Sequence, residues 1–134
     1  MAAVRFYKDE RITQLRGISL FSGCTKEELR RIAPLQSQYQ VKKSDVLIQY
    51  GTPGEECFVI VNGRATVIRN GIQLAQLGPG DFFGELAPLD GGPRTATVVA
   101  DTEMLLLVIS RLEFSLLRTS FPTVAGKLLA EVGA

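Results

Sequence analysis

A carboxylate and a guanidinium stand nine residues apart in one short stretch, FGELAPLDGGPRTAT, which spans residues 83–97. Gly84 has no Cβ, so the backbone there can turn sharply and come close to a ligand. If residues 84–87 form a single helical turn, their N–H groups and the positive end of the helix dipole meet at one spot. Pro88 then ends that turn. The stretch therefore predicts a binding site for a small anion.

The polar side chains of this stretch indicate which anion the site is built for. Arg94 follows a Gly-Gly-Pro turn and is expected to fold back toward the same spot, where its planar fork holds two phosphate oxygens. Ionised Glu85 only accepts hydrogen bonds, so it requires a hydroxyl group nearby. Thr95 adds a hydroxyl, and Ala96 leaves its N–H unobstructed. A phosphate beside a sugar hydroxyl describes a nucleotide; the alternative is an ordinary loop, with Glu85 solvated and Arg94 its surface partner.

The composition excludes several other kinds of chemistry. The chain has 134 residues, a size typical of one domain, and it contains no histidine. This absence excludes Ser-His and Cys-His nucleophiles and zinc, iron or copper sites built from histidine. Carboxylate-only metal sites stay open in principle. Because the net charge is only +1 and the two signs are interleaved, we expect no direct binding to nucleic acid.

The chain is expected to be cytoplasmic. Its first twenty residues carry charges throughout and lack the apolar run and cleavage site of a signal peptide. No apolar stretch is long enough to cross a bilayer, so we expect no membrane insertion. Cys24 and Cys57 stand in unrelated contexts, which favours a reducing compartment with free thiols.

The order of the elements predicts one domain over residues 1–134. Residues 1–36 are expected to be helical, residues 37–110 to form the β-rich part that carries the 83–97 stretch, and residues 111–134 to return to helix. Eight short β-rich runs separated by turn residues predict an antiparallel sandwich or barrel; they read YQV, DVLIQYG, CFVIVNG, RATVIRNG, IQLAQLG, DFFG, TATVVAD and EMLLLVIS. Asn70-Gly71 is the strongest hairpin signal, because a type I′ turn needs positive φ at both central positions.

Two capping boxes mark where helices begin. Thr25 with Glu28 starts one helix, and Ser110 with Glu113 starts another. In the second of these helices, three leucines are predicted to form the stripe that faces the core; they are Leu112, Leu116 and Leu117.

Several blocks of the sequence, taken in order, resemble the cyclic nucleotide-binding domain family. That family includes catabolite-activator-type regulators, regulatory subunits of cyclic-nucleotide-dependent kinases and cyclic-nucleotide-gated channels. Its phosphate-binding cassette reads approximately F-G-E-[LIM]-A-L and then P-R-[AST]-A-[TS], which here is FGELAPLDGGPRTAT. The upstream blocks LFSGCTKEELRRIA, VLIQYGTPGEECFVIVNGRATV and QLGPGDFFGE also match, so the resemblance extends from about Leu15 to Leu129. Pro88 and Ser44 depart from the family pattern, the latter at a common turn glycine.

The resemblance implies a mainly β fold with flanking helices, in which about eight strands form an antiparallel, jelly-roll-like β-roll. It implies that Arg94 holds the cyclic phosphate and that Glu85 accepts from the ribose 2′-hydroxyl. The other ligand-binding residues that it implies are Phe83, Gly84, Leu86, Ala87, Thr95, Ala96, Val67 and Leu74. Val67 and Leu74 fall where family members line the base pocket, and plain barrel core is their alternative.

The resemblance implies a regulatory sensor, with no enzymatic activity, no catalytic or metal-binding residue and no cofactor. The expected ligand is cAMP, favoured over cGMP. Its binding is expected to move the C-terminal helices and to act on an effector domain or partner protein outside this chain. Leu128, Leu129 and Val132 are candidates to cover the base, with simple packing as the alternative. Two other functions stay open: a degenerate member that serves as a protein-interaction module, and a cupin-type metal enzyme, against which the absence of histidine argues.

Overall fold

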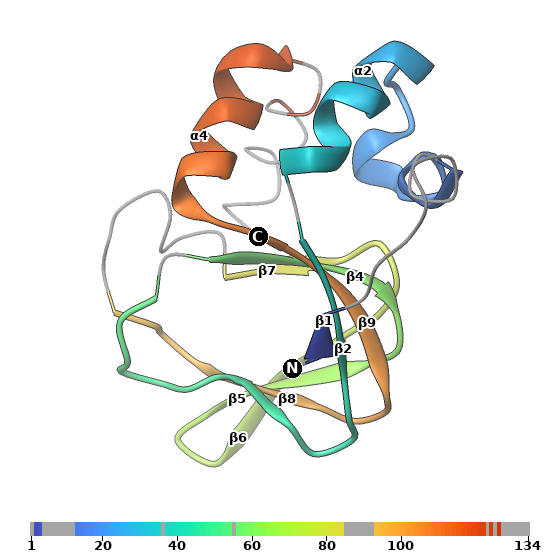
Figure 1. Cartoon of the computed structure of the whole chain (residues 1–134). Coiled ribbons are helices and arrows are strands. Elements are labelled where there is room, and N and C mark those ends of the chain that lie inside the picture. The colour runs from blue at the N-terminus through green and yellow to red at the C-terminus, as the bar shows by residue number, and fades with distance from the viewer. Residues whose placement is uncertain are drawn as a thin grey trace.

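The structure of the protein is a computed structural model that describes residues 2–3, 13–35, 37–54, 56–84, 93–122, 124 and 126. Two antiparallel sheets form a β-roll, and the helices lie together on one side of it (Figure 1). The first sheet has the strand order β1 (Ala2–Ala3), β2 (Ser37–Val41), β9 (Met104–Ile109), β4 (Cys57–Asn62) and β7 (Phe82–Phe83). The second sheet has the order β3 (Val46–Ile48), β8 (Thr97–Ala100), β5 (Ala65–Arg69) and β6 (Ile72–Leu77).

The predicted fold class is confirmed. Each of the eight β-rich runs overlaps one strand, from β2 to β9, and β2 begins two residues before its run. Strand β1 was not predicted: Ala2 and Ala3 pair with Gln40 and Tyr39 of β2, in a region where the sequence predicted helix. A strand of two residues is too short to leave a periodic pattern in the sequence, so only its partner strand defines it.

Two turns use backbone conformations that most side chains avoid. Asn70 and Gly71 have φ values of 53° and 74°, and the flanking residues pair as Arg69 with Ile72. This confirms the predicted two-residue hairpin between β5 and β6. Ser44, where the family has a common glycine, also has a positive φ, of 76°, and its N–H donates to the carbonyl of Ala100 at 2.7 Å.

Both capping boxes are present as predicted. In the helix α2 (Lys26–Ile32), the Thr25 hydroxyl accepts from the N–H of Glu28 at 3.1 Å, and the Glu28 carboxylate accepts from the N–H of Thr25 at 2.9 Å. Ser110 and Glu113 make the same pair of bonds at the start of α4 (Arg111–Ser120). Two 3-10 turns, η1 (Ser19–Phe21) and η2 (Ala33–Leu35), flank α2. None of the helices among the described residues is long and apolar enough to cross a membrane.

The core-facing stripe of α4 differs from the prediction. Phe114 and Leu117 are the buried residues of this helix, whereas Leu112 is 71% exposed and Leu116 is 39% exposed. The prediction was therefore wrong for Leu112 and Leu116. The four apolar residues of α4 are spread around much of the helix, so their spacing alone does not tell which side meets the sheet. The side that is buried carries Phe114 and Leu117.

The first sheet separates two hydrophobic cores. Along β4 and β9, alternate residues face the helices or the inside of the roll. The helix-side core contains Cys57, Val59, Leu107 and Ile109 together with helical residues such as Leu29, Phe114 and Leu117. The roll core contains Phe58, Ile60, Leu106 and Val108 together with residues of the second sheet such as Val98 and Ala100. The helical layer and the roll are therefore joined through a shared sheet.

Candidate functional site

Arg94 lies just before β8, at the end of the 83–97 stretch, and its side chain is only 8% exposed. Its Nη1 donates to the carbonyl oxygen of Gly84 at 3.0 Å, and its Nη2 donates to the carbonyl oxygen of Glu56 at 2.9 Å. The guanidinium therefore links the residue after β7 to the residue before β4. Arg94 is therefore not the surface residue that the ordinary-loop alternative expected; Glu85, the other residue of that alternative, lies outside the described residues.

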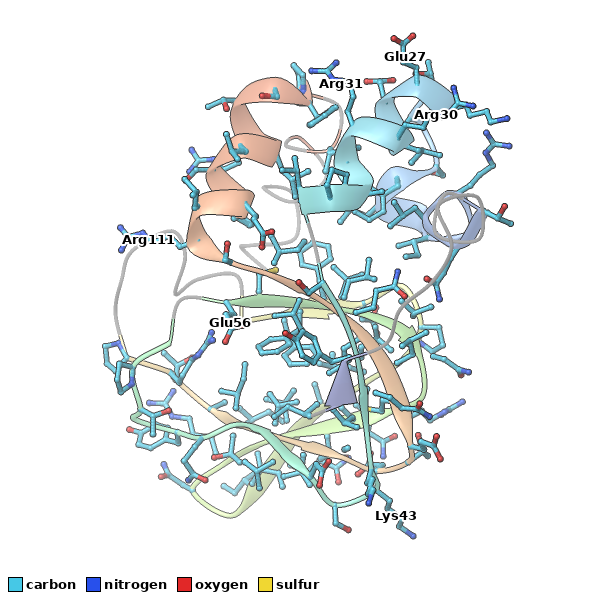
Figure 2. The ribbon with its side chains drawn as sticks, viewed as in Figure 1. Glu27, Arg30, Arg31, Lys43, Glu56 and Arg111 are labelled. Atoms are coloured by element: carbon cyan, nitrogen blue, oxygen red, sulfur yellow. The ribbon has the colours of Figure 1, made fainter. Side chains whose placement is uncertain are left out.

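The backbone of Arg94 is fixed to the loop before β4. Its N–H donates to the carbonyl of Thr52 at 2.9 Å, and its carbonyl accepts from the N–H of Gly51 at 2.8 Å. Glu56 lies on the side of the roll beneath the start of α4, which Arg111 marks in Figure 2. A charged side chain held at both its backbone and its guanidinium is pre-organised, so little further ordering is needed when it meets an anion.

Gly84 approaches this guanidinium closely. Its φ is +78°, and a Cβ built on it would lie 2.9 Å from Arg94 Nη1 and 3.0 Å from the Glu56 carbonyl oxygen. The third neighbour of that Cβ would be Ile48 Cδ1, at 3.1 Å. Both the backbone conformation and the space therefore favour glycine here, where the backbone comes close to the side chain of Arg94.

The residues on either side of the site have different environments. Phe83 is buried and stacks on Phe58, with ring centroids 5.0 Å apart and an interplanar angle of 12°, so its side chain belongs to the roll core. Thr95 is exposed and Ala96 is half-buried, and both directly follow Arg94. The next residue, Thr97, accepts from the N–H of Tyr50 at 3.0 Å, which ties the start of β8 to the same loop region.

Val67 and Leu74 lie on the neighbouring strands β5 and β6. Val67 is half-buried and packs against the roll core, whereas Leu74 is 57% exposed, so plain barrel core is wrong for Leu74. A β-bulge in β6 lies at Leu74, because Val67 pairs with Ala75 while the next residue of β5 pairs two positions away. An apolar side chain exposed at a bulge is available to contact a ligand.

Some of the predicted residues lie outside the described part of the chain. These are Glu85, Leu86 and Ala87 of the cassette, its Pro88, and the candidate base-covering residues Leu128, Leu129 and Val132. The structure adds two groups that the sequence did not predict, the carbonyl oxygens of Glu56 and Thr52, which accept from Arg94. Every residue carries a backbone carbonyl, so side-chain types give no signal for such acceptors.

Comparison with known proteins finds relatives of this chain in sequence and in fold. A family model described as the cyclic nucleotide-binding domain matches residues 38–120. A cyclic nucleotide-gated potassium channel from Rhizobium etli is 42% identical over 80 residues, which is 60% of this chain and 22% of the channel.

Two solved structures share the fold. The regulatory subunit of a cAMP-independent protein kinase A from Trypanosoma brucei superposes with a TM-score of 0.81 and 25% identity, over 95% of this chain and 46% of that one. The regulatory domain of Toxoplasma gondii PKA, co-crystallised with cAMP, superposes with a TM-score of 0.65 and 28% identity, over 81% of this chain and 43% of that one. The chain thus covers less than half of each of these three relatives.

Proposed function

The chain belongs to the cyclic nucleotide-binding domain family, and from this premise we propose that it binds cAMP in preference to cGMP and transmits that binding as a sensor. The family is regulatory, not catalytic. The observation that carries the proposal is the buried Arg94 guanidinium beside the carbonyl oxygens of Gly84 and Glu56. A cyclic phosphate has one negative charge, which one guanidinium can neutralise through charge-assisted hydrogen bonds.

The rest of the proposed site surrounds that phosphate. Glu85 accepts from the ribose 2′-hydroxyl, which is the free hydroxyl of a 3′,5′-cyclic nucleotide. Backbone groups of residues 83–87 and the residues Thr95 and Ala96 complete the phosphate and sugar contacts. Val67 and Leu74 contact the base, and the half-buried and exposed positions of their side chains support this role. No cofactor is required.

The preference for cAMP is supported by the relative from Toxoplasma gondii, whose structure contains cAMP. A second candidate function also has a specific observation in its favour. The relative from Trypanosoma brucei is the regulatory subunit of a kinase described as cAMP-independent, and its fold superposes with a TM-score of 0.81. The alternative is therefore a protein-interaction module that keeps the fold and does not bind a cyclic nucleotide.

A short path through the first sheet, made of chain neighbours and paired strands, supports the proposed coupling of the site to the C-terminal helix. The Glu56 carbonyl that accepts from Arg94 precedes Cys57, and Cys57 pairs with Ile109 at the end of β9. Ser110 follows immediately and caps α4. A ligand that binds more tightly when α4 is in one position than in another shifts the population toward that position.

The movement of α4 would act on an effector domain or partner protein, because relatives that carry such a domain are channels and kinase subunits. We place the protein in the cytoplasm, without direct contact to nucleic acid.

The test is calorimetric titration of the wild-type protein with cAMP and with cGMP, alongside Arg94→Ala. The substitution removes a charge-assisted phosphate partner, so we expect a loss of about 1.5–3 kcal/mol, roughly ten- to a hundredfold in affinity. Arg64→Ala is the matched control, because Arg64 is an exposed arginine before β5. The nucleotide affinity of this variant is expected to equal that of the wild type. Folded wild-type protein that binds neither nucleotide would leave the interaction module as the function.

A further inference from the structure

We infer that Gly54, which lies outside the cassette, is a positioning residue of the nucleotide site: its missing side chain allows the Arg94 guanidinium to take the place from which it meets the phosphate. The inference deepens the proposed function and rests on it. Gly54 precedes β4 in the loop whose backbone is already bonded to Arg94 through Gly51 and Thr52.

The guanidinium occupies the space that a side chain at position 54 would need. A Cβ built on Gly54 would lie 2.7 Å from Arg94 Nη2 and 2.8 Å from Cζ, and closer still to Nε. Because it would be nearer to both nitrogens than to Cζ, it would press on the Nε–Nη2 side of the guanidinium. That side carries N–H donors, so the substitution would displace the donors as well as the carbon stem.

Gly84 lies against a different atom of the guanidinium, Nη1. A Cβ at Gly84 would meet Nη1 at 2.9 Å, while the carbonyl oxygens of Gly84 and Glu56 receive Nη1 and Nη2. Two glycines and two carbonyl oxygens thus fix where the positive charge lies. Charge-assisted hydrogen bonds require donor–acceptor distances of about 2.7–2.9 Å, so a displaced guanidinium no longer reaches the same phosphate oxygens.

The loop offers a matched control for this effect. Gly51 has a φ of +78°, and a Cβ there would meet nothing within 4 Å. Its substitution therefore strains the backbone without a side-chain collision with Arg94, whose carbonyl accepts from the Gly51 N–H. Gly54 is the reverse case: its φ is outside the left-handed region, and its Cβ would collide with Arg94. Gly51→Ala and Gly54→Ala therefore separate backbone strain from displacement of the guanidinium, within four residues of one another.

A thermal-unfolding cycle without nucleotide tests the contact itself. In the wild-type background, Gly54→Ala is expected to lower Tm by at least about 3 °C, because the collision acts as overpacking. In an Arg94→Ala background the same substitution leaves Tm unchanged, while Gly51→Ala lowers Tm equally in both backgrounds. If Arg94→Ala does not fold, Arg94→Leu replaces it, since its side chain ends before the position of Nε. Equal losses for Gly54→Ala in both backgrounds would overturn the inference.

Titration with cAMP tests the consequence for binding. Gly54→Ala is expected to weaken binding roughly tenfold or more, as for partial loss of a charge-assisted partner. Gly78→Ala, whose added Cβ would meet nothing within 4 Å, is the control for affinity and is expected to bind as the wild type does. Wild-type affinity in Gly54→Ala would overturn the inference and leave the proposed function in place. If the wild type binds neither nucleotide, the proposed function fails, and the thermal cycle still decides whether Gly54 positions Arg94.

Discussion

Gln38 carries a buried side-chain amide that has no hydrogen-bond partner among the described residues. The residue lies in β2 and is 2% exposed, and within the part of the chain that the structure describes neither its Nε2 nor its Oε1 makes a hydrogen bond. It pairs with Leu107 of β9, a residue of the helix-side core. A buried polar group without a partner loses its hydration and gains nothing in return, at a cost of about 1–3 kcal/mol. Gln38 therefore weakens the contact between the first sheet and the helices.

Replacing this amide should stabilise the protein. We expect Gln38→Leu to raise the free energy of unfolding by about 1–3 kcal/mol, because a leucine of similar size removes the unpaired groups and adds apolar contact. Urea unfolding of the two proteins measures the difference. Gln40→Leu is the control, since Gln40 is exposed on the same strand and donates to Glu103. A destabilised Gln38→Leu protein would mean that the amide has a stabilising role.

At this scale, the sequence predicts what depends on neighbours along the chain. Asn70-Gly71 predicted its hairpin correctly, because the positive φ values of a type I′ turn limit the residue types that can occupy it. The groups that hold the Arg94 guanidinium could not be predicted in this way. They are the backbone carbonyls of Gly84 and Glu56, and a residue of any type would supply a carbonyl. Arg94 itself was predicted to lie at the site, and the structure shows in addition that its side chain is buried and held by backbone groups.

Among the elements, α4 has one feature that depends on chain neighbours and could be predicted, and one that depends on distant residues and could not. Its start was predicted because the Ser110–Glu113 capping box joins residues three positions apart. Its buried side was not predicted, since that depends on where the first sheet lies in space. Phe114 and Leu117 meet the helix-side core, while Leu112 and Leu116 lie on the exposed side.

This assignment of the two sides predicts unequal effects of truncation. Phe114→Ala is expected to cost about 3–5 kcal/mol in the free energy of unfolding, because it leaves a cavity in the helix-side core. Leu112→Ala is expected to change it by less than about 0.5 kcal/mol, as for other exposed positions. Denaturant unfolding of both variants measures these values. Comparable losses at the two positions would show that Leu112 is covered by another part of the protein.

For the whole molecule, the decisive feature is that the two cores have a sheet in common. Leu106 and Leu107 are consecutive residues of β9, both fully buried, yet Leu106 belongs to the roll core and Leu107 to the helix-side core. The strand cannot lose one set of contacts without disturbing the other. The coupling proposed above would use this connection, and the same connection should make unfolding cooperative.

The two leucines form a matched pair for testing that cooperativity. Leu106→Ala and Leu107→Ala should each cost about 2–5 kcal/mol, since each removes a fully buried side chain. In both variants, thermal unfolding followed by circular dichroism at 222 nm, which is dominated by the helices, should coincide with the calorimetric transition of the whole protein. If the helical signal of Leu107→Ala disappears at a lower temperature than the calorimetric transition, the helical layer unfolds separately. The shared sheet would then not transmit the state of the nucleotide site to α4, and the proposed coupling would need a different path.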